Sequence, residues 1–168
     1  MSLVYFRNWE GEKIKEGVFE YGENDQPLVD FLNKKAEKFI RQRISTVKTI
    51  YFEGNFVGYY AIAMSSITAS DLFDEKRTST LPHPAIIIGK LLIDKKHRNK
   101  KLGSTTIVNI VRVAQMLHKH AACRFIIVDA KKGVEKFYES NGFQKIMSED
   151  AKKQTEITPM LFDLMPPK

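Results

Sequence analysis

Cysteine is nearly absent from this chain. Cys123 is the single cysteine among 168 residues, which excludes a disulfide within the chain and fits a reducing compartment. It lies in an apolar segment, so we expect a small core residue there rather than a nucleophile. Long apolar runs are also missing, since no stretch approaches the roughly 20 residues of a membrane-spanning helix. The start, MSLVYFRNWEG, carries no targeting signal. We expect a cytoplasmic protein with no membrane partner.

Two nucleotide-binding motifs are absent as well. The chain has neither the Gly-Lys-Ser/Thr of a P-loop nor the three spaced glycines of a dinucleotide fingerprint. What it has is positive charge: 27 Lys and Arg against 20 Asp and Glu, a net charge of +7. That excess makes RNA or a CoA-type cofactor plausible without choosing between them. The apolar content of 43% and the chain length predict one domain spanning residues 1–168.

The spacing of apolar residues predicts a mixed α/β fold around one sheet. We expect helices from about Asp25 to 43, with Pro27 in the first turn, and at 102–120 and 131–142. Residues 70–84 read as a polar loop. Strands are expected at 3–9, 45–53, 56–67, 85–94, 123–130 and 155–164.

The stretch KKHRNKKLGSTT, Lys95–Thr106, places five Lys and Arg side chains before a glycine and the start of a helix. The first amides of a helix have no partners within it and favour anions such as phosphate. Gly103 would let a phosphate approach the backbone closely, and Arg98, Lys100 and Lys101 would add charge. The alternative is a solvated basic loop in which Gly103 is only a turn residue, and composition alone favours that alternative.

LLIDKKHRNKKLGSTTI resembles motif A of the GNAT superfamily, the acetyl-CoA-dependent N-acetyltransferases. In that motif a strand leads into an Arg/Gln-x-x-Gly-x-Gly/Ala turn and a helix. Arg98 stands at the first position and Gly103 at the last, while Lys101 replaces the usual first glycine. The Lys101 side chain would either crowd a diphosphate or bind it through its ammonium group.

VEKFYESNGFQKI resembles the second GNAT signature, a helix with Phe-Tyr followed by Gly-Phe, here Phe137, Tyr138, Gly142 and Phe143. The resemblance implies a central, mostly antiparallel sheet flanked by helices, with acetyl-CoA as cosubstrate and no metal. It implies Tyr138 as the general acid for the leaving thiolate; without the resemblance, Tyr138 reads as a buried aromatic. The implied cofactor-binding residues are Leu92, Ile93, Arg98, Asn99, Lys100, Lys101, Leu102, Gly103, Ser104 and Phe137.

No side chain stands out as a general base. Glu135 and Glu139 lie near Tyr138 in the sequence, but exposed helix carboxylates are usually solvated. A base can be dispensable, because an α-amino group titrates near about 8 and is partly neutral at pH 7. This favours an aminoacyl ester or a peptide N-terminus over a lysine side chain as the acceptor.

FEYGENDQPLVDFL, FVGYYAIAMSSI and LPHPAIIIGKLLID resemble the GNAT branch of bacterial toxins that acetylate aminoacyl-tRNA. This resemblance implies tRNA as the acceptor and a ribbon-helix-helix antitoxin as a partner, and a homodimer is possible. A small amine, a polyamine or a protein N-terminus remain alternatives, as does a non-catalytic acyl-CoA-binding module. The side chains that could contact the acceptor stem are Lys95, Lys96, Lys100, Lys101, Arg112, Lys131 and Lys132.

Overall fold

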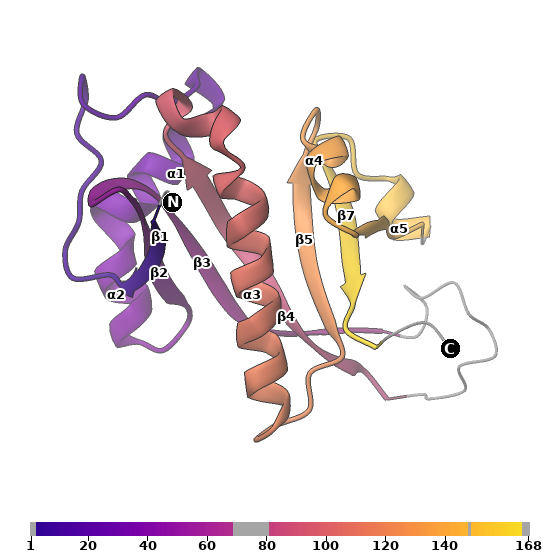
Figure 1. The fold of residues 1–168 in the computed structure, drawn as a ribbon. Helices are drawn as coiled ribbons and strands as arrows, with labels where there is room; N and C mark the ends of the chain where they lie inside the picture. The colour runs from indigo at the N-terminus through magenta and orange to yellow at the C-terminus, as the bar shows by residue number, and fades with distance from the viewer. Residues whose placement is uncertain (1–2, 69–80, 148, 166–168) are drawn as a thin grey trace. The chain divides into compact units, whose positions relative to one another are not determined.

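The structure is a computed structural model that describes residues 3–68, 81–147 and 149–165 (Figure 1). The chain divides into two compact units, each described by itself below. Unit 1 comprises Met1–Ala63 and Gly89–Thr106, and unit 2 comprises Met64–Ile88 and Ile107–Lys168. Most of the loop predicted at 70–84 lies outside the described residues.

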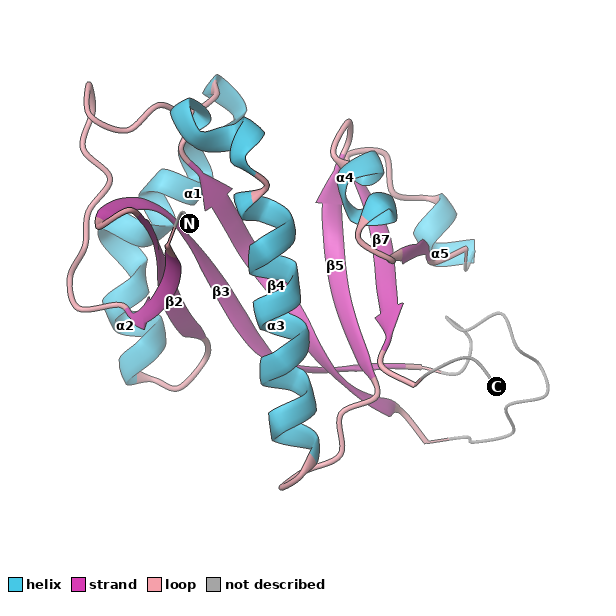
Figure 2. Ribbon diagram, in the orientation of Figure 1, coloured by secondary structure: helices cyan, strands magenta, loops and turns pink. Residues whose placement is uncertain are grey.

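The described strands form a seven-stranded sheet in the order β1-β2-β3-β4-β5-β7-β6 (Figure 2). Pairing is antiparallel for β1–β2, β2–β3, β5–β7 and β6–β7, and parallel for β4–β5. The predicted mixed α/β class with a mostly antiparallel sheet is therefore confirmed. The strands are β1 (Val4–Asn8), β2 (Thr46–Phe52), β3 (Asn55–Ile67), β4 (His83–Ile93), β5 (Phe125–Lys131), β6 (Gln144–Lys145) and β7 (Ile157–Asp163).

Five α-helices and three irregular helical segments accompany these strands among the described residues. The α-helices are α1 (Gln26–Asp30), α2 (Ala36–Arg41), α3 (Leu102–His118), α4 (Glu135–Ser140) and α5 (Glu149–Lys152). Two 3₁₀ segments cover Glu23–Asp25 and Lys95–Lys100, and a π-helical turn covers Phe31–Lys35.

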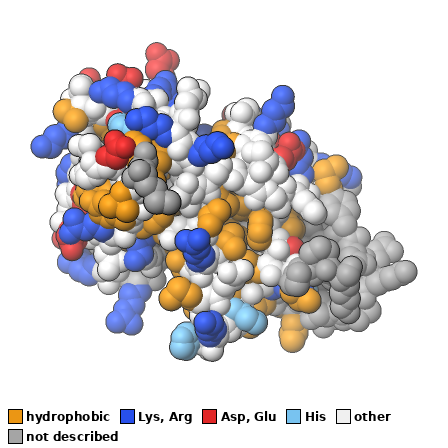
Figure 3. Space-filling view, viewed as in Figure 1, with side chains coloured by type: hydrophobic (Ala, Val, Ile, Leu, Met, Phe, Trp, Pro, Cys, Tyr) orange, Lys and Arg blue, Asp and Glu red, His pale blue; other side chains and the backbone are white. Residues whose placement is uncertain are grey.

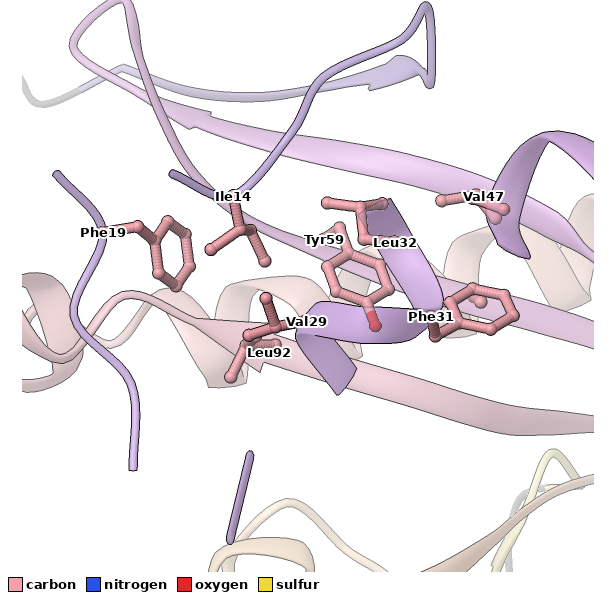
Figure 4. Packing of buried hydrophobic residues seen from close by; sticks show 10 residues of the cluster. Ile14, Phe19, Val29, Phe31, Leu32, Val47, Tyr59 and Leu92 are labelled. Atoms are coloured by element: carbon pink, nitrogen blue, oxygen red, sulfur yellow. The ribbon is translucent and has the colours of Figure 1, made fainter. Parts of the chain in front are cut away.

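The first predicted helix is interrupted by the π-helical turn, which separates α1 from α2. In such a turn the amides bond one residue further back than in an α-helix, so carbonyls at the junction lose their regular partners. The Leu28 carbonyl accepts from the Phe31 amide and, in addition, from the Tyr59 hydroxyl of β3 at 2.6 Å. Figure 4 shows the Tyr59 oxygen pointing toward the segment that carries Val29 and Phe31. The Tyr59 side chain is fully buried in the core of unit 1.

We expect Tyr59→Phe to lower the free energy of unfolding by about 0.5–1.5 kcal/mol, because it removes one of the two donors to the Leu28 carbonyl. Urea unfolding measures the change. Tyr5→Phe is the matched control, since Tyr5 is half-buried and its stacking on Tyr51 at 5.1 Å does not need the hydroxyl. Its effect should stay within about 0.5 kcal/mol. Equal effects of the two substitutions would contradict a structural role for the Tyr59–Leu28 bond.

Unit 2 is built around β5, which pairs with β4 on one side and β7 on the other. Its small core contains Ile67, Ala85 and Phe125, packed against half-buried Ile127 and Leu161. Cys123 is buried, as predicted, and burial raises the pKa of its thiol. The α4 helix follows β5 directly and carries the second signature.

The bounds of several elements differ from the sequence prediction, and two short elements were not predicted. β4 begins at His83 rather than Ala85, since Pro84 is tolerated at a strand start and its carbonyl accepts from the Arg124 amide at 2.9 Å. β6 and α5 were not predicted, because a two-residue strand and a four-residue helix leave no periodic pattern. The short helix expected at 131–142 is confined to Glu135–Ser140. β5 extends to Lys131, and Gly133 (φ 90°) and Gly142 (φ 89°) interrupt the helical backbone on either side.

Candidate active site

Asp94 fixes the point where β4 turns into the basic segment of unit 1. Its backbone amide donates to the Val57 carbonyl at 2.8 Å. Its buried carboxylate accepts from the amides of Lys96 at 3.0 Å and Glu20 at 3.3 Å. Asp94 therefore acts as the N-cap of the 3₁₀ segment, a role that sequence reasoning missed. The sequence feature that could have indicated this cap is an aspartate directly after an apolar strand, because aspartate is a preferred N-cap residue.

Three of the five cations in this segment interact with a neighbouring carboxylate, carbonyl or aromatic ring, which offsets part of the repulsion between them. The Lys96 ammonium lies 3.7 Å from the Glu20 carboxylate and donates to the Val18 carbonyl at 2.9 Å. Arg98 pairs with a carboxylate oxygen of Asp25 at 3.3 Å. The Lys100 ammonium lies over the Phe52 ring, 4.7 Å from its centroid.

These interactions partly support the alternative interpretation, in which the segment is a solvated basic loop. The Lys96 and Arg98 pairs are exposed at the surface, and such pairs contribute little, about 0–1 kcal/mol. The Asp25 carboxylate also accepts from the Gly22 amide at 3.0 Å, so it is held by two donors. The positive charge of the segment is neutralised in part by these carboxylates.

Lys101 adopts the backbone conformation that a glycine would adopt. Its φ is 57° and ψ is 18°, in the left-handed region, which costs an ordinary residue roughly 1–2 kcal/mol. Lys101 stands where motif A usually has a glycine, and its backbone adopts a conformation that glycine reaches easily. The exposed Lys101 side chain adds a cation at a point where the motif usually has no side chain.

The α3 helix begins immediately after Lys101, as the sequence predicted, and its first turn lies in unit 1. The first helical bond joins the Thr105 amide to the Lys101 carbonyl at 3.0 Å. The amides of Leu102, Gly103 and Ser104 therefore have no acceptor within α3. Leu102 is buried and Asn99 is exposed. The predicted phosphate-binding positions run from the end of the 3₁₀ segment through Lys101 into the first turn of α3, all within unit 1.

Leu92 and Ile93 occupy the last part of β4, also in unit 1. The parallel ladder with β5 pairs Ala85–Ile88 with Phe125–Val128, and β4 continues past that ladder to Ile93. The Leu92 side chain is buried in the core of unit 1, next to Val29 (Figure 4).

Tyr138 and Phe137 belong to unit 2, on α4. The Tyr138 ring packs edge-on against Phe137 at 5.0 Å and Phe143 at 5.3 Å between centroids. Phe143 in turn contacts Phe162 of β7 at 5.6 Å. Burial disfavours the phenolate and raises the pKa of Tyr138 to about 12, so the hydroxyl keeps its proton at neutral pH.

The two carboxylates of α4 have structural partners. Glu135 accepts from the Gly133 amide at 2.7 Å and from the Thr158 hydroxyl at 3.0 Å. Hydrogen bonds, first from its own backbone amide, lower the pKa of Glu135. Glu139 lies 3.3 Å from the Lys145 ammonium. A carboxylate with a lowered pKa is a poor proton acceptor, so Glu135 lacks the features of a general base. Glu139 is paired with Lys145 instead.

Comparison with known proteins settles the family. A family model for the acetyltransferase (GNAT) domain matches residues 15–164. The chain belongs to this family. The resemblance predicted from its two signatures is thereby confirmed, and the match covers both units of this GNAT protein.

Relatives of this GNAT protein include bacterial toxins. A tRNA-acetylating toxin of Mycobacterium tuberculosis is 26% identical over 116 residues, which is 68% of this chain and 70% of that protein. The toxin AtaT complexed with acetyl-methionyl-tRNAfMet superposes with a TM-score of 0.78 at 19% identity, covering 95% of this chain and 94% of that one. An AtaT mutant bound to acetyl-CoA and the C-terminus of the antitoxin AtaR gives 0.73 at 17% identity, covering 96% and 93%.

None of the helices in the described part of the chain is long and apolar enough to cross a membrane. Within the same part of the chain, no three His, Cys, Asp or Glu side chains are grouped as a metal ion would require.

Proposed function

We propose that this GNAT protein transfers an acetyl group from acetyl-CoA to the α-amino group of aminoacyl-tRNA. The observation that supports coenzyme binding most directly is the left-handed Lys101 before α3, which preserves the backbone of a glycine turn. The mycobacterial relative supports the choice of acceptor. A small amine remains the second candidate, because the chemistry of an α-amino group does not by itself require tRNA.

The residues at the start of α3 fit a diphosphate. The amides of Leu102, Gly103 and Ser104 would donate hydrogen bonds to its oxygens, and Arg98, Lys100 and Lys101 would balance its charge. The backbone of Leu92 and Ile93, beyond the ladder with β5, would hold the acyl arm and polarise the carbonyl. Asn99 and Phe137 are the remaining residues proposed to bind acetyl-CoA. Acetyl-CoA would supply the acetyl group as a thioester.

Tyr138 is the proposed general acid. A phenol that remains protonated can donate to sulfur as negative charge develops there. Burial among aromatic rings keeps the Tyr138 proton in place through the neutral range. The acceptor amine loses its proton to water, since an α-amino group is already partly neutral at pH 7.

The pH dependence of acetyl transfer follows from these assignments. We expect kcat/KM to rise with pH up to about 8, as the acceptor amine becomes neutral. It should then stay level to about pH 10, because Tyr138 with a pKa of about 12 does not yet lose its proton. Initial rates between pH 6 and 10, corrected for ester hydrolysis, measure the profile. A fall beginning near pH 9 would contradict a buried phenol as the acid.

Positive charge supports tRNA as the acceptor, but not through a single patch. On the face shown in Figure 3, Lys and Arg side chains are spread among carboxylates and other groups. Phosphate neutralisation by several dispersed cations still supplies much of the affinity for RNA. Lys131, Lys132 and Arg112 are exposed in unit 2 and remain proposed contacts.

The deciding experiment measures transfer of radiolabelled acetyl from acetyl-CoA to tRNA charged with each amino acid. Free amino acids, polyamines and peptide N-termini are the competing acceptors in parallel reactions. We expect label in the aminoacyl fraction that alkaline hydrolysis releases from the RNA. Transfer to free amines alone would replace tRNA by a small acceptor, and no transfer to any amine would favour a binding module.

Aminoacyl-tRNA as the acceptor also suggests the cell compartment in which the protein acts and a protein partner. Charged tRNA is a cytoplasmic molecule, so we place the protein in the cytoplasm. An acetylating toxin needs a neutralising protein, and a ribbon-helix-helix antitoxin is the proposed one. AtaT has an antitoxin, AtaR, whose C-terminus binds it.

A further inference from the structure

Gly58 of β3 lies where no side chain fits. A Cβ at this position would lie 2.3 Å from the Leu92 carbonyl oxygen and 3.1 Å from the Ile93 Cα. Both neighbours are backbone atoms, so no rotamer change can relieve the contact. The spacing between the strands would have to grow by about 1 Å to reach an ordinary contact. Gly58 has no unusual backbone angle, so the restriction is one of space.

A β-bulge in β3, next to Gly58, orients a backbone carbonyl toward the end of β4. Ile50 of β2 pairs with Gly58, while the next residue, Tyr51, pairs with Phe56. Val57 is therefore the extra residue of the bulge. Its carbonyl accepts from the Asp94 amide at 2.8 Å. The bulge and the missing side chain together set the position of the β4 backbone just before the basic segment.

We propose that Gly58 is a positioning residue for acetyl transfer. It acts through Leu92 and Ile93, whose backbone can lie against β3 only because position 58 lacks a Cβ. This inference rests on the proposed function, in which that backbone holds and polarises the acyl group. A displacement of about 1 Å in a reacting geometry can lower a rate about 100-fold.

The test compares Gly58→Ala with Gly89→Ala. A Cβ at Gly89 of β4 would meet only the Ala61 carbonyl oxygen, at an ordinary 3.8 Å. Both variants add one methyl group to a strand of unit 1. We expect Gly58→Ala to lower kcat about 100-fold while changing the Kd of free coenzyme A less than about threefold. Gly89→Ala should keep kcat within about threefold of the original chain.

The split between kcat and coenzyme affinity separates positioning from stability. A purely structural role would lower the melting temperature of Gly58→Ala and leave kcat per folded molecule unchanged, and that result would overturn the inference. Equal kcat values for the two variants would overturn it as well. Failure of the proposed function gives a different result, because the original chain would then transfer acetyl to no acceptor.

A measurement on the original chain decides the matter if Gly58→Ala does not fold. The NMR signals of Gly58 should shift when acetyl-CoA is added at saturation, and shift less with coenzyme A that lacks the acetyl group. Gly54, in the β2–β3 turn with no atoms near its Cβ position, is the reference. Unchanged Gly58 signals in the acetyl-CoA complex would contradict the inference.

Discussion

Replacing Tyr138 by phenylalanine is expected to lower kcat about 1000-fold, within the 10²- to 10⁴-fold range of general acid–base catalysis. The substitution removes only the hydroxyl. The ring keeps its edge-on contacts with Phe137 and Phe143, so the fold and the affinity for coenzyme A should be preserved. Acetyl transfer at saturating substrates and calorimetric titration of coenzyme A measure the two quantities separately.

The control for this substitution is Tyr59→Phe, which also removes one hydroxyl from a buried tyrosine. It should lower stability and leave kcat per folded molecule unchanged, the reverse of the result for Tyr138→Phe. Retention of full activity by Tyr138→Phe would remove Tyr138 from the mechanism. A parallel loss of stability and activity would mean that the hydroxyl only supports the packing of α4.

Replacing Gly103 by glutamate is expected to weaken coenzyme A binding about 1000-fold while stabilising the protein. A carboxylate in the first turn of α3 would stand where the diphosphate is proposed to bind, and like charges in contact cost several kcal/mol. The same carboxylate favours the helix, by about 0.3–1 kcal/mol through the helix dipole. Loss of a glycine from a helix adds about 0.5–1 kcal/mol. Calorimetry and urea unfolding test the two effects.

Gly103→Ala separates charge from size in this prediction. It adds a side chain at the same position without a charge, so its coenzyme affinity should lie between those of the original chain and Gly103→Glu. Unchanged affinity in the glutamate variant would show that the start of α3 is not where the phosphates bind.

Much of the fold could be predicted because its signals are local. The apolar run at 85–94 and the three-and-four spacing after Leu102 correctly predicted β4 and α3. The π-helical turn could not be predicted, since Phe31–Lys35 reads as ordinary helix. The Tyr59 hydroxyl of β3 bonds to the Leu28 carbonyl just before this turn, a contact between distant residues that no local pattern reveals.

The sequence alone indicated which residues to consider for the candidate site, but not which other residues they contact. Resemblance to the two signatures located Tyr138 and the turn before α3, and the family is confirmed. The roles of the individual residues stay predictions. The partners of Arg98 and Lys96 come from residues 18–25, and the Gly58 restriction depends on the distance between two strands. Such features arise only when the chain is folded.

The attachment of residues 18–25 to the basic segment has a practical consequence. Glu20 bonds to Lys95 and Asp94 through its backbone, and Asp25 holds Arg98. Trimming the N-terminal part of the chain to simplify purification or labelling would therefore also loosen the turn before α3. A fluorophore belongs elsewhere, for example at Lys119, which is exposed in the turn after α3.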